Sequence, residues 1–212
     1  MIGDIIDLKP QYYEPAAELI THLLPIVQAQ PRTVIAVAGE SGSGKTVLAL
    51  CLQHLLATAN IKAIVLHQDD YFRLPPNDNH AARLANIQNV GRQEVRTDLL
   101  EAHISQYKNG ETYLHKPLVD YPNNSILAET ITLTNSAVLI VEGTYSLSLS
   151  GADTRIFMSR NYLETQAQRA ERAREASDDF IETVLAIEHL LIAPTAQKAD
   201  FIINKNYTVV GA

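Results

Sequence analysis

Residues 39–46 have the sequence GESGSGKT, which fits the pattern GxxxxGK[ST] of a phosphate-binding loop. Glycines in such a loop let successive backbone N–H groups turn toward phosphate oxygens. Lys45 can reach the β- and γ-phosphates of a nucleotide, and the Thr46 hydroxyl can bind Mg²⁺. The predicted nucleotide-binding residues of the loop are Gly39, Glu40, Ser41, Gly42, Ser43, Gly44, Lys45 and Thr46.

Acidic residues follow two further apolar runs that are typical of buried strands. Asp69 and Asp70 come after residues 61–67, and Glu142 comes after residues 137–141. Ligands of open α/β sheets bind beyond the carboxyl ends of the strands, so Glu142 is predicted to bind Mg²⁺, directly or through water. One of the two aspartates is predicted to orient an acceptor hydroxyl and take its proton. The alternative for each is a carboxylate that caps a turn.

Three arginines lie in a predicted helix, residues 162–176, that has little apolar face of its own. Such a helix suits a lid that closes over a nucleotide and excludes water. Arg169 and Arg172 are three residues apart and share a helix face, and Arg174 follows them. One interpretation is that all three contact phosphates; the other, which spacing alone slightly favours, is a solvent-exposed helix whose glutamates balance the arginines.

The elements that position these residues alternate between strands and helices. The predicted strands are residues 33–38, 61–67, 137–141, 154–158 and 200–203, and the main predicted helices are residues 47–59, 94–107, 162–176 and 178–191. Short joins between strand, helix and strand imply right-handed parallel crossovers. The fold class is therefore α/β, with a mostly parallel five-stranded sheet and helices on both faces.

One domain over residues 1–212 is expected, with three special segments. Residues 1–31 are predicted to be an N-terminal helical extension, whose apolar face is interrupted at Pro25. Residues 73–124 are proline-rich and less regular, and are predicted to be an insertion that binds the acceptor. Residues 162–176 are the predicted lid.

Composition and charge narrow the class of protein. The chain has 46% hydrophobic and 19% charged residues, as expected of a globular protein, and its formal charge of -7 disfavours nucleic acid as a broad partner. No secretory signal and no apolar run of roughly 20 residues are present, so no membrane partner and a cytoplasmic location are expected. Cys51 lies in an apolar helical pattern and is predicted to be a core thiol. Both a monomer and a homo-oligomer are consistent with the sequence.

Four segments resemble the uridine kinase and phosphoribulokinase family of P-loop kinases. They are the loop at 39–46, HQDDYF at 67–72, LIVEGTYSL at 139–147 and the arginine-bearing segment at 169–174, and together they span most of the chain after residue 31. The resemblance implies a P-loop nucleotide kinase-like fold and transfer of the γ-phosphoryl group of ATP or GTP, with Mg²⁺, to an alcohol. It singles out Asp69 as the base, with Lys45 as the second catalytic residue. It also implies that Glu142 binds Mg²⁺ together with Thr46, and that the lid arginines contact the phosphates.

The acceptor region departs from the family pattern. An Asp-His-Pro segment of uridine kinases is replaced by residues 90–95, VGRQEV, and a Tyr-Asp-Phe stretch with a nearby His is replaced by residues 119–121 and Asn124. The predicted acceptor-binding residues are Asp70, Tyr71, Arg92, Arg96, Asp120 and Tyr121. Arg92 and Arg96 would suit an anionic acceptor such as a phosphorylated sugar.

The predicted substrates are a nucleoside triphosphate and a nucleoside, uridine or cytidine. Alternative acceptors are pantothenate, a sugar phosphate or another metabolite. A regulatory GTPase switch is a second alternative, because residues 204–207 resemble the guanine-reading NKxD pattern, although Tyr207 occupies the place of its Asp. A nucleotide-binding protein without catalysis is a third.

Overall fold

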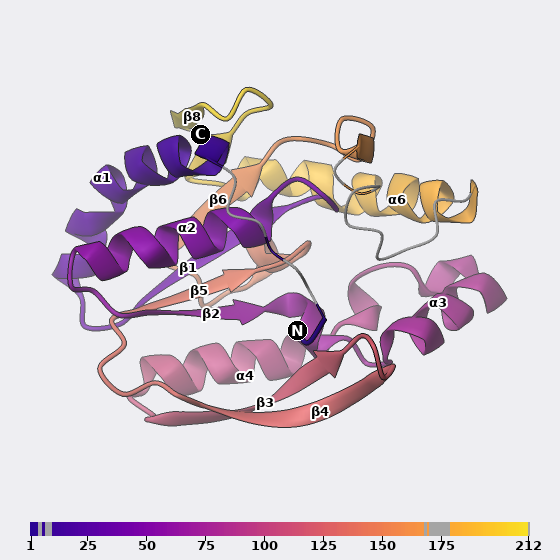
Figure 1. Ribbon diagram of the computed structural model, residues 1–212, viewed down its shortest axis with the longest axis horizontal. Coiled ribbons are helices and arrows are strands. Elements are labelled where there is room, and N and C mark those ends of the chain that lie inside the picture. Colours follow the sequence, from indigo (N-terminus) through magenta and orange to yellow (C-terminus); the bar gives the residue numbers. More distant parts are fainter. Residues whose placement is uncertain (4–5, 7–9, 168, 170–178, 212) are drawn as a thin grey trace.

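The five predicted strands lie parallel in one sheet. The computed structural model describes residues 1–3, 6, 10–167, 169 and 179–211. The parallel strands are β1 (Thr33–Gly39), β2 (Ala63–His67), β5 (Val138–Glu142), β6 (Thr154–Met158) and β7 (Phe201–Ile203). Among the described residues a sixth strand, β8 (Val209–Gly211), adds antiparallel to β7 and gives the order β2-β5-β1-β6-β7-β8 (Figure 1). The predicted fold class is confirmed, with β8 as an addition.

Helices cover both faces of the sheet. The α-helices described are α1 (Tyr13–Ala29), α2 (Lys45–Thr58), α3 (Pro76–Ala85), α4 (Thr97–Lys108) and α6 (Asp179–Ile192). Side chains alternate along β1, so Ile35 and Val37 pack with α1 and α2, whereas Val34 and Ala38 pack with α4 on the opposite face. Burial on both faces explains why the parallel strands are continuous apolar runs.

Helix α1 continues through Pro25 to Ala29, so the prediction that Pro25 interrupts it was wrong. A proline inside a helix removes one backbone hydrogen bond. Burial of Leu23 and Val27 in the core offsets that loss. Helix α1 packs along α2 in Figure 1, so the predicted N-terminal helix contributes directly to the main core.

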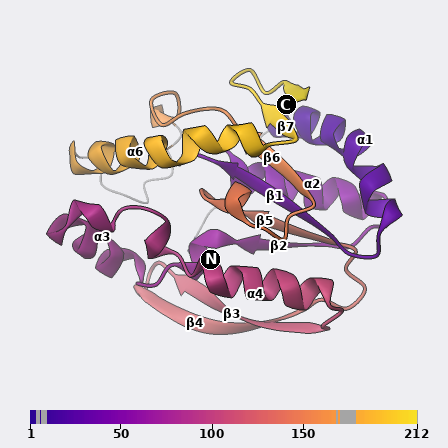
Figure 2. The same cartoon turned by 180° about the vertical axis from the view of Figure 1, so that it is seen from behind.

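The predicted insertion contains helices α3 and α4 and the first strand of a β-hairpin that the sequence analysis did not predict. Strands β3 (Tyr113–Asp120) and β4 (Ser125–Thr132) pair antiparallel as a separate two-stranded sheet. Pro117 lies inside β3 and hid the strand, because proline is tolerated there only in edge strands or at bulges. The hairpin lies beside α4, seen from opposite sides in Figures 1 and 2.

Helix α4 begins at Thr97, three residues later than predicted. The residues before it include a short 3-10 turn, η4 (Arg92–Glu94). The side chain of Glu94 holds this turn by accepting a hydrogen bond from the backbone N–H of Gly91 at 2.7 Å. In the part of the chain that the structure describes, no helix is both long and apolar enough to cross a membrane.

Candidate active site

The phosphate-binding loop joins β1 to α2, as its pattern predicts. Gly42 and Gly44 have left-handed backbone conformations, with φ of 74° and 101°. A Cβ atom at Gly44 would lie 2.2 Å from the ring of Tyr12, so a larger residue would be both strained and obstructed. The Ser43 hydroxyl is buried and has no hydrogen-bond partner among the described residues. A buried donor inside a ring of backbone N–H groups fits a loop built to hold phosphate oxygens.

The end of β5 lies beside the first turn of α2. Strand β5 pairs with β1 and β2, and Glu142 is in register with Val37 and His67. Its carboxylate Oε1 accepts hydrogen bonds from Thr46 Oγ1 at 3.1 Å and from His67 Nδ1 at 2.7 Å. The predicted neighbourhood of Glu142 and the loop is therefore present, and His67 is an additional member that the sequence analysis did not select.

The pKa values of the Asp69 and Glu142 carboxyl groups at this edge are shifted in opposite directions. Burial raises the pKa of Asp69, and the nearby Glu142 carboxylate raises it further, against the effects of Lys45 and His67. Burial acts in the same direction on Glu142, but the hydrogen bond and electrostatic attraction of His67, together with Lys45 and Thr46, lower the pKa of Glu142 below its ordinary value. Glu142 thus remains an anion while Asp69 becomes a stronger base than an ordinary aspartate.

The residues at this edge fit a nucleotide-bound Mg²⁺. No group of three or more His, Cys, Asp or Glu side chains suited to a metal occurs in the described ranges. A nucleotide-bound Mg²⁺ needs fewer protein ligands, because it is held by one or two protein oxygens, phosphates and waters. The Thr46 hydroxyl and the Glu142 carboxylate provide such a pair of oxygens, and the low pKa of Glu142 keeps it in the charged form that a metal prefers.

Arg169 lies over the phosphate-binding loop. A Cβ atom at Gly42 would come within 2.8 Å of Arg169 Cγ, and Thr165 Oγ1 donates to the carbonyl of Ser41 at 2.8 Å. The guanidinium of Arg169 binds Glu182 of α6 at 2.7 Å. The other two predicted lid arginines, Arg172 and Arg174, lie outside the described residues.

Glu40 connects the loop to two other elements. Its buried carboxylate accepts from the Tyr162 N–H at 2.7 Å and from His189 Nδ1 at 2.6 Å. Its carbonyl accepts a hydrogen bond of 3.0 Å from Lys45 Nζ. Glu40 thus holds the beginning of the predicted lid and helix α6 against the loop, in addition to the nucleotide-binding role predicted for it.

A cavity of about 320 Å³ begins at Ser41 and extends between α3, α6 and the end of β3. Figures 1 and 2 both place α3 beside α6 at the end of the molecule where this cavity lies. Asp69 lines it, so the predicted base faces the space next to the loop. The rest of the wall includes apolar Phe72, Leu74, Val184 and Leu185 and polar Asn77, Asn79, Arg83 and Glu188.

Of the six predicted acceptor residues, Tyr121 lines this cavity and the other five are not among its lining residues. Asp70 is fully buried, where its carboxylate binds Lys116 Nζ at 2.8 Å and the Val119 N–H at 2.9 Å. Tyr71 is also fully buried, and its hydroxyl is 2.8 Å from His103 Nδ1. Their surroundings give both side chains a structural role.

The remaining three predicted acceptor residues also point elsewhere. Asp120 accepts hydrogen bonds from the backbone and side chain of Asn123, at 3.1 and 2.9 Å, and so closes the turn between β3 and β4. Arg92 and Arg96 are exposed. Asp120 was selected because residues 119–121 replace the Tyr-Asp-Phe stretch of uridine kinases, but its carboxylate is used in the turn between β3 and β4.

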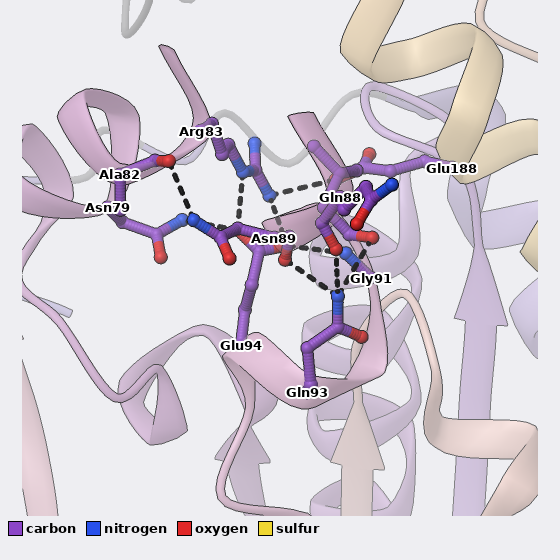
Figure 3. Close-up of polar contacts among 10 residues, drawn as sticks. Asn79, Ala82, Arg83, Gln88, Asn89, Gly91, Gln93, Glu94 and Glu188 are labelled. Atoms are coloured by element: carbon purple, nitrogen blue, oxygen red, sulfur yellow. Dashed lines mark hydrogen bonds and ion pairs between the residues drawn. The ribbon is translucent and has the colours of Figure 1, made fainter. Parts of the chain in front are cut away.

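Sequence reasoning missed the charged network in the cavity wall. Arg83 binds Glu94 through Nε at 2.5 Å and Nη2 at 3.0 Å, and it binds Glu188 of α6 at 3.0 Å (Figure 3). Glu188 is far from the other two in the sequence, and α3 is a polar helix in which a buried arginine cannot be distinguished from an exposed one. The available signal was that Arg83 and Glu94 both lie within the predicted acceptor insertion.

A P-loop between a buried parallel strand and a helix, with carboxylates at the neighbouring strand ends and a cavity beside them, defines a P-loop kinase. The chain belongs to the Phosphoribulokinase / Uridine kinase family, whose model matches residues 34–210. Membership makes the chain a kinase, a nucleotide-binding phosphotransferase with a small-molecule substrate, and implies ATP-dependent phosphoryl transfer.

Relatives with curated names and solved structures agree with this family. The chain is 26% identical over 182 residues to a uridine kinase from Leuconostoc citreum, covering 80% of this chain and 86% of that protein. It is 26% identical over 195 residues to a bifunctional alpha-galactosidase/sucrose kinase from Mediterraneibacter gnavus, covering 85% of this chain but only 21% of that protein. The fold is similar to that of a Bacillus stearothermophilus protein described as a possible uridine kinase, with a TM-score of 0.68, 19% identity and coverage of 89% and 97% of the two chains.

Proposed function

We propose that this kinase transfers the γ-phosphoryl group of ATP or GTP, bound with Mg²⁺, to a hydroxyl of a small polyhydroxyl acceptor that occupies the cavity beside Asp69. The observation that carries the proposal is the position of Asp69, which lines the cavity at the edge of the sheet where Lys45 and Glu142 influence its pKa. Phosphoryl transfer depends mainly on positioning and charge stabilisation, and this edge supplies both.

Each residue has a distinct role in the proposed reaction. The loop N–H groups and Lys45 would hold the β- and γ-phosphates, and Thr46 and Glu142 would hold Mg²⁺, which would supply positive charge beside those phosphates. Asp69 accepts a hydrogen bond from the acceptor hydroxyl and takes its proton as the oxygen attacks the γ-phosphorus, whose bond to the β–γ bridging oxygen breaks to release the nucleoside diphosphate. The side chain of Arg169 lies over the loop and would bring positive charge near the phosphates.

Nucleosides and sugars are both candidates for the acceptor. The names of two relatives point to uridine and to sucrose. The aromatic side chains of Phe72 and Tyr121 and the amides of Asn77 and Asn79 suit either a nucleoside or a sugar. Uridine or cytidine remains the first proposal from the resemblance of the machinery, and an uncharged sugar is the second.

The test is acceptor-dependent release of ADP. Uridine, cytidine, sucrose, fructose, pantothenate and sugar phosphates are supplied one at a time, with ATP and Mg²⁺. Turnover with one class of acceptor is expected, whereas equal hydrolysis with and without acceptor would indicate a nucleotide switch. Lys45→Ala should lower transfer by about two orders of magnitude or more. Asp69→Asn should abolish transfer and leave ATP binding intact, and unchanged turnover would remove Asp69 from the role of base.

A further inference from the structure

The wall of the acceptor cavity contains a buried arginine that is held by two carboxylates. Arg83 of α3, Glu94 of η4 and Glu188 of α6 have side chains that are only 10%, 4% and 12% exposed. Two parallel hydrogen bonds join Arg83 to Glu94, the geometry that makes an arginine–carboxylate pair both strong and directional. Figure 3 shows that the guanidinium reaches both acids, and its Nη2 donates to each of them.

The network is fixed by further contacts. Glu94 also accepts hydrogen bonds from the Gly91 N–H at 2.7 Å and from Asn79 Nδ2 at 2.9 Å. Four donors, three on α3 and one on the backbone of Gly91, therefore determine the position of one carboxylate. Arg83 cannot move toward a ligand without leaving a buried carboxylate that lacks its partner, and breaking such a pair is strongly unfavourable.

The charges of this wall disfavour an anionic acceptor. One guanidinium faces two carboxylates within the network, and Asp69 adds another carboxylate to the cavity lining. Arg92 and Arg96, the arginines that suggested a phosphorylated sugar, are exposed and are not among the lining residues. A phosphate group in this cavity would face excess negative charge in a poorly solvated place, where electrostatic repulsion is weakly screened.

Hydroxyl groups match the same wall. Ionised carboxylates only accept hydrogen bonds, so they require donors from the ligand, and a fully ionised phosphate group offers none. A sugar hydroxyl can donate to a carboxylate and accept from a guanidinium or amide N–H at the same time. The apolar side chains of Leu74, Val184 and Leu185 can pack against the C–H face of a sugar ring. A volume of about 320 Å³ is near the lower end for small-molecule sites.

From these relationships we propose that Arg83, held by Glu94 and Glu188, determines the acceptor class and selects an uncharged polyhydroxyl acceptor over a phosphorylated or carboxylated one. This inference rests on the proposed kinase function and specifies its substrate. Arg83 presents a fixed hydrogen-bond donor to the acceptor, and Glu188 both accepts from acceptor hydroxyls and repels anions.

The first experiment compares matched acceptors. Acceptor-dependent ADP release is measured for the unchanged protein with fructose, glucose, uridine and sucrose, and with fructose 6-phosphate, glucose 6-phosphate and pantothenate. Higher kcat/KM for uncharged acceptors supports the inference. A preference for a phosphorylated acceptor or pantothenate overturns it while leaving the kinase function intact. No transfer to any acceptor, with ATP still bound, would overturn the proposed function and the inference together.

The second experiment separates specificity from a structural role. Arg83→Gln should raise the KM for the best uncharged acceptor about 10- to 100-fold, the effect expected on losing a hydrogen bond from a charged donor, and leave the KM for ATP unchanged. Glu188→Gln keeps Arg83 paired with Glu94 and removes one negative charge, so it should lower the discrimination against fructose 6-phosphate severalfold. Arg73→Gln, at an exposed arginine of the same region, is the matched control and should change neither value.

Folding is followed by thermal melting, so that loss of structure is not mistaken for loss of specificity. If Arg83→Gln does not fold, Glu188→Gln and the milder Arg83→Lys decide the question through the same ratio of kcat/KM values. Unchanged discrimination in Glu188→Gln, or equal increases in the KM values of acceptor and ATP in the folded Arg83 variant, would overturn the inference.

Discussion

The Thr46 hydroxyl donates a hydrogen bond of 3.1 Å to Glu142 Oε1, which joins the first turn of α2 to the end of β5. The same oxygen accepts a hydrogen bond from His67 Nδ1 at 2.7 Å. The two proposed Mg²⁺ ligands, Thr46 and Glu142, are therefore joined with His67 in one hydrogen-bonded cluster. A histidine that binds a metal-ligating carboxylate orients it and increases its affinity for the metal. The contact makes His67 a positioning residue for Glu142.

Replacing His67 should therefore weaken Mg²⁺ binding without removing a ligand. In His67→Ala, the Mg²⁺ concentration that gives half-maximal transfer should rise about tenfold, the lower end of effects seen for partners of metal ligands. The measurement is a Mg²⁺ titration of acceptor-dependent ADP release at fixed ATP. His115→Ala, at an exposed histidine in β3, is the control. An unchanged Mg²⁺ requirement in His67→Ala would show that the contact does not position Glu142.

The raised pKa of Asp69 predicts a stability cost that depends on pH. Its folded-state pKa lies above the ordinary value, mainly because of burial, so the folded protein disfavours the ionised carboxylate. The wild type thus loses stability as pH rises from the ordinary pKa of aspartate toward the higher folded-state pKa of Asp69. Asp69→Asn avoids this loss. The variant should melt at a higher temperature than wild type at pH 7, and the difference should shrink as pH falls toward the ordinary pKa of aspartate.

Melting curves between pH 4 and pH 8 test this prediction, within the range where the fold persists. Glu111→Gln, at an exposed carboxyl, controls for removal of one negative charge and should shift the melting temperature little at any of these pH values. A lower melting temperature for Asp69→Asn at pH 7, or a difference that does not depend on pH, would contradict the assigned burial cost.

Helix α1 is predicted to be essential for stability. Leu19 is fully buried between α1 and the core around α2. Leu19→Ala should lower the free energy of unfolding by about 2 to 5 kcal/mol, through lost burial and the cavity that remains. Glu18→Ala, at the neighbouring exposed position, should change it by less than about 0.5 kcal/mol. Urea unfolding measures both, and equal values would indicate that α1 is a peripheral extension.

Local sequence patterns were sufficient for the parts of the site that depend on one strand end. Apolar runs indicated the parallel strands, so the neighbourhood of Glu142 and the loop could be predicted from sequence. Contacts between distant segments could not: Asp70 follows the same strand as Asp69, but Lys116 of β3 binds it in the interior. The position of β3 depended on a hairpin that Pro117 concealed, and the Arg83 network depended on where α3 meets α6.

The last prediction concerns the single cysteine. Cys51 of α2 is fully buried, and burial raises the pKa of its thiol to about 11. At pH 8 about one thiol in a thousand would be ionised, and the thiolate is the reactive form. A thiol-directed reagent should therefore label the native protein only as fast as it unfolds, and label it rapidly in urea. ATP with Mg²⁺ should slow native labelling further, because ligand binding stabilises the folded state.

Cys51→Ala is the control for background reaction. Rapid labelling of the folded protein, unaffected by nucleotide, would contradict the burial of this thiol in the core around α2.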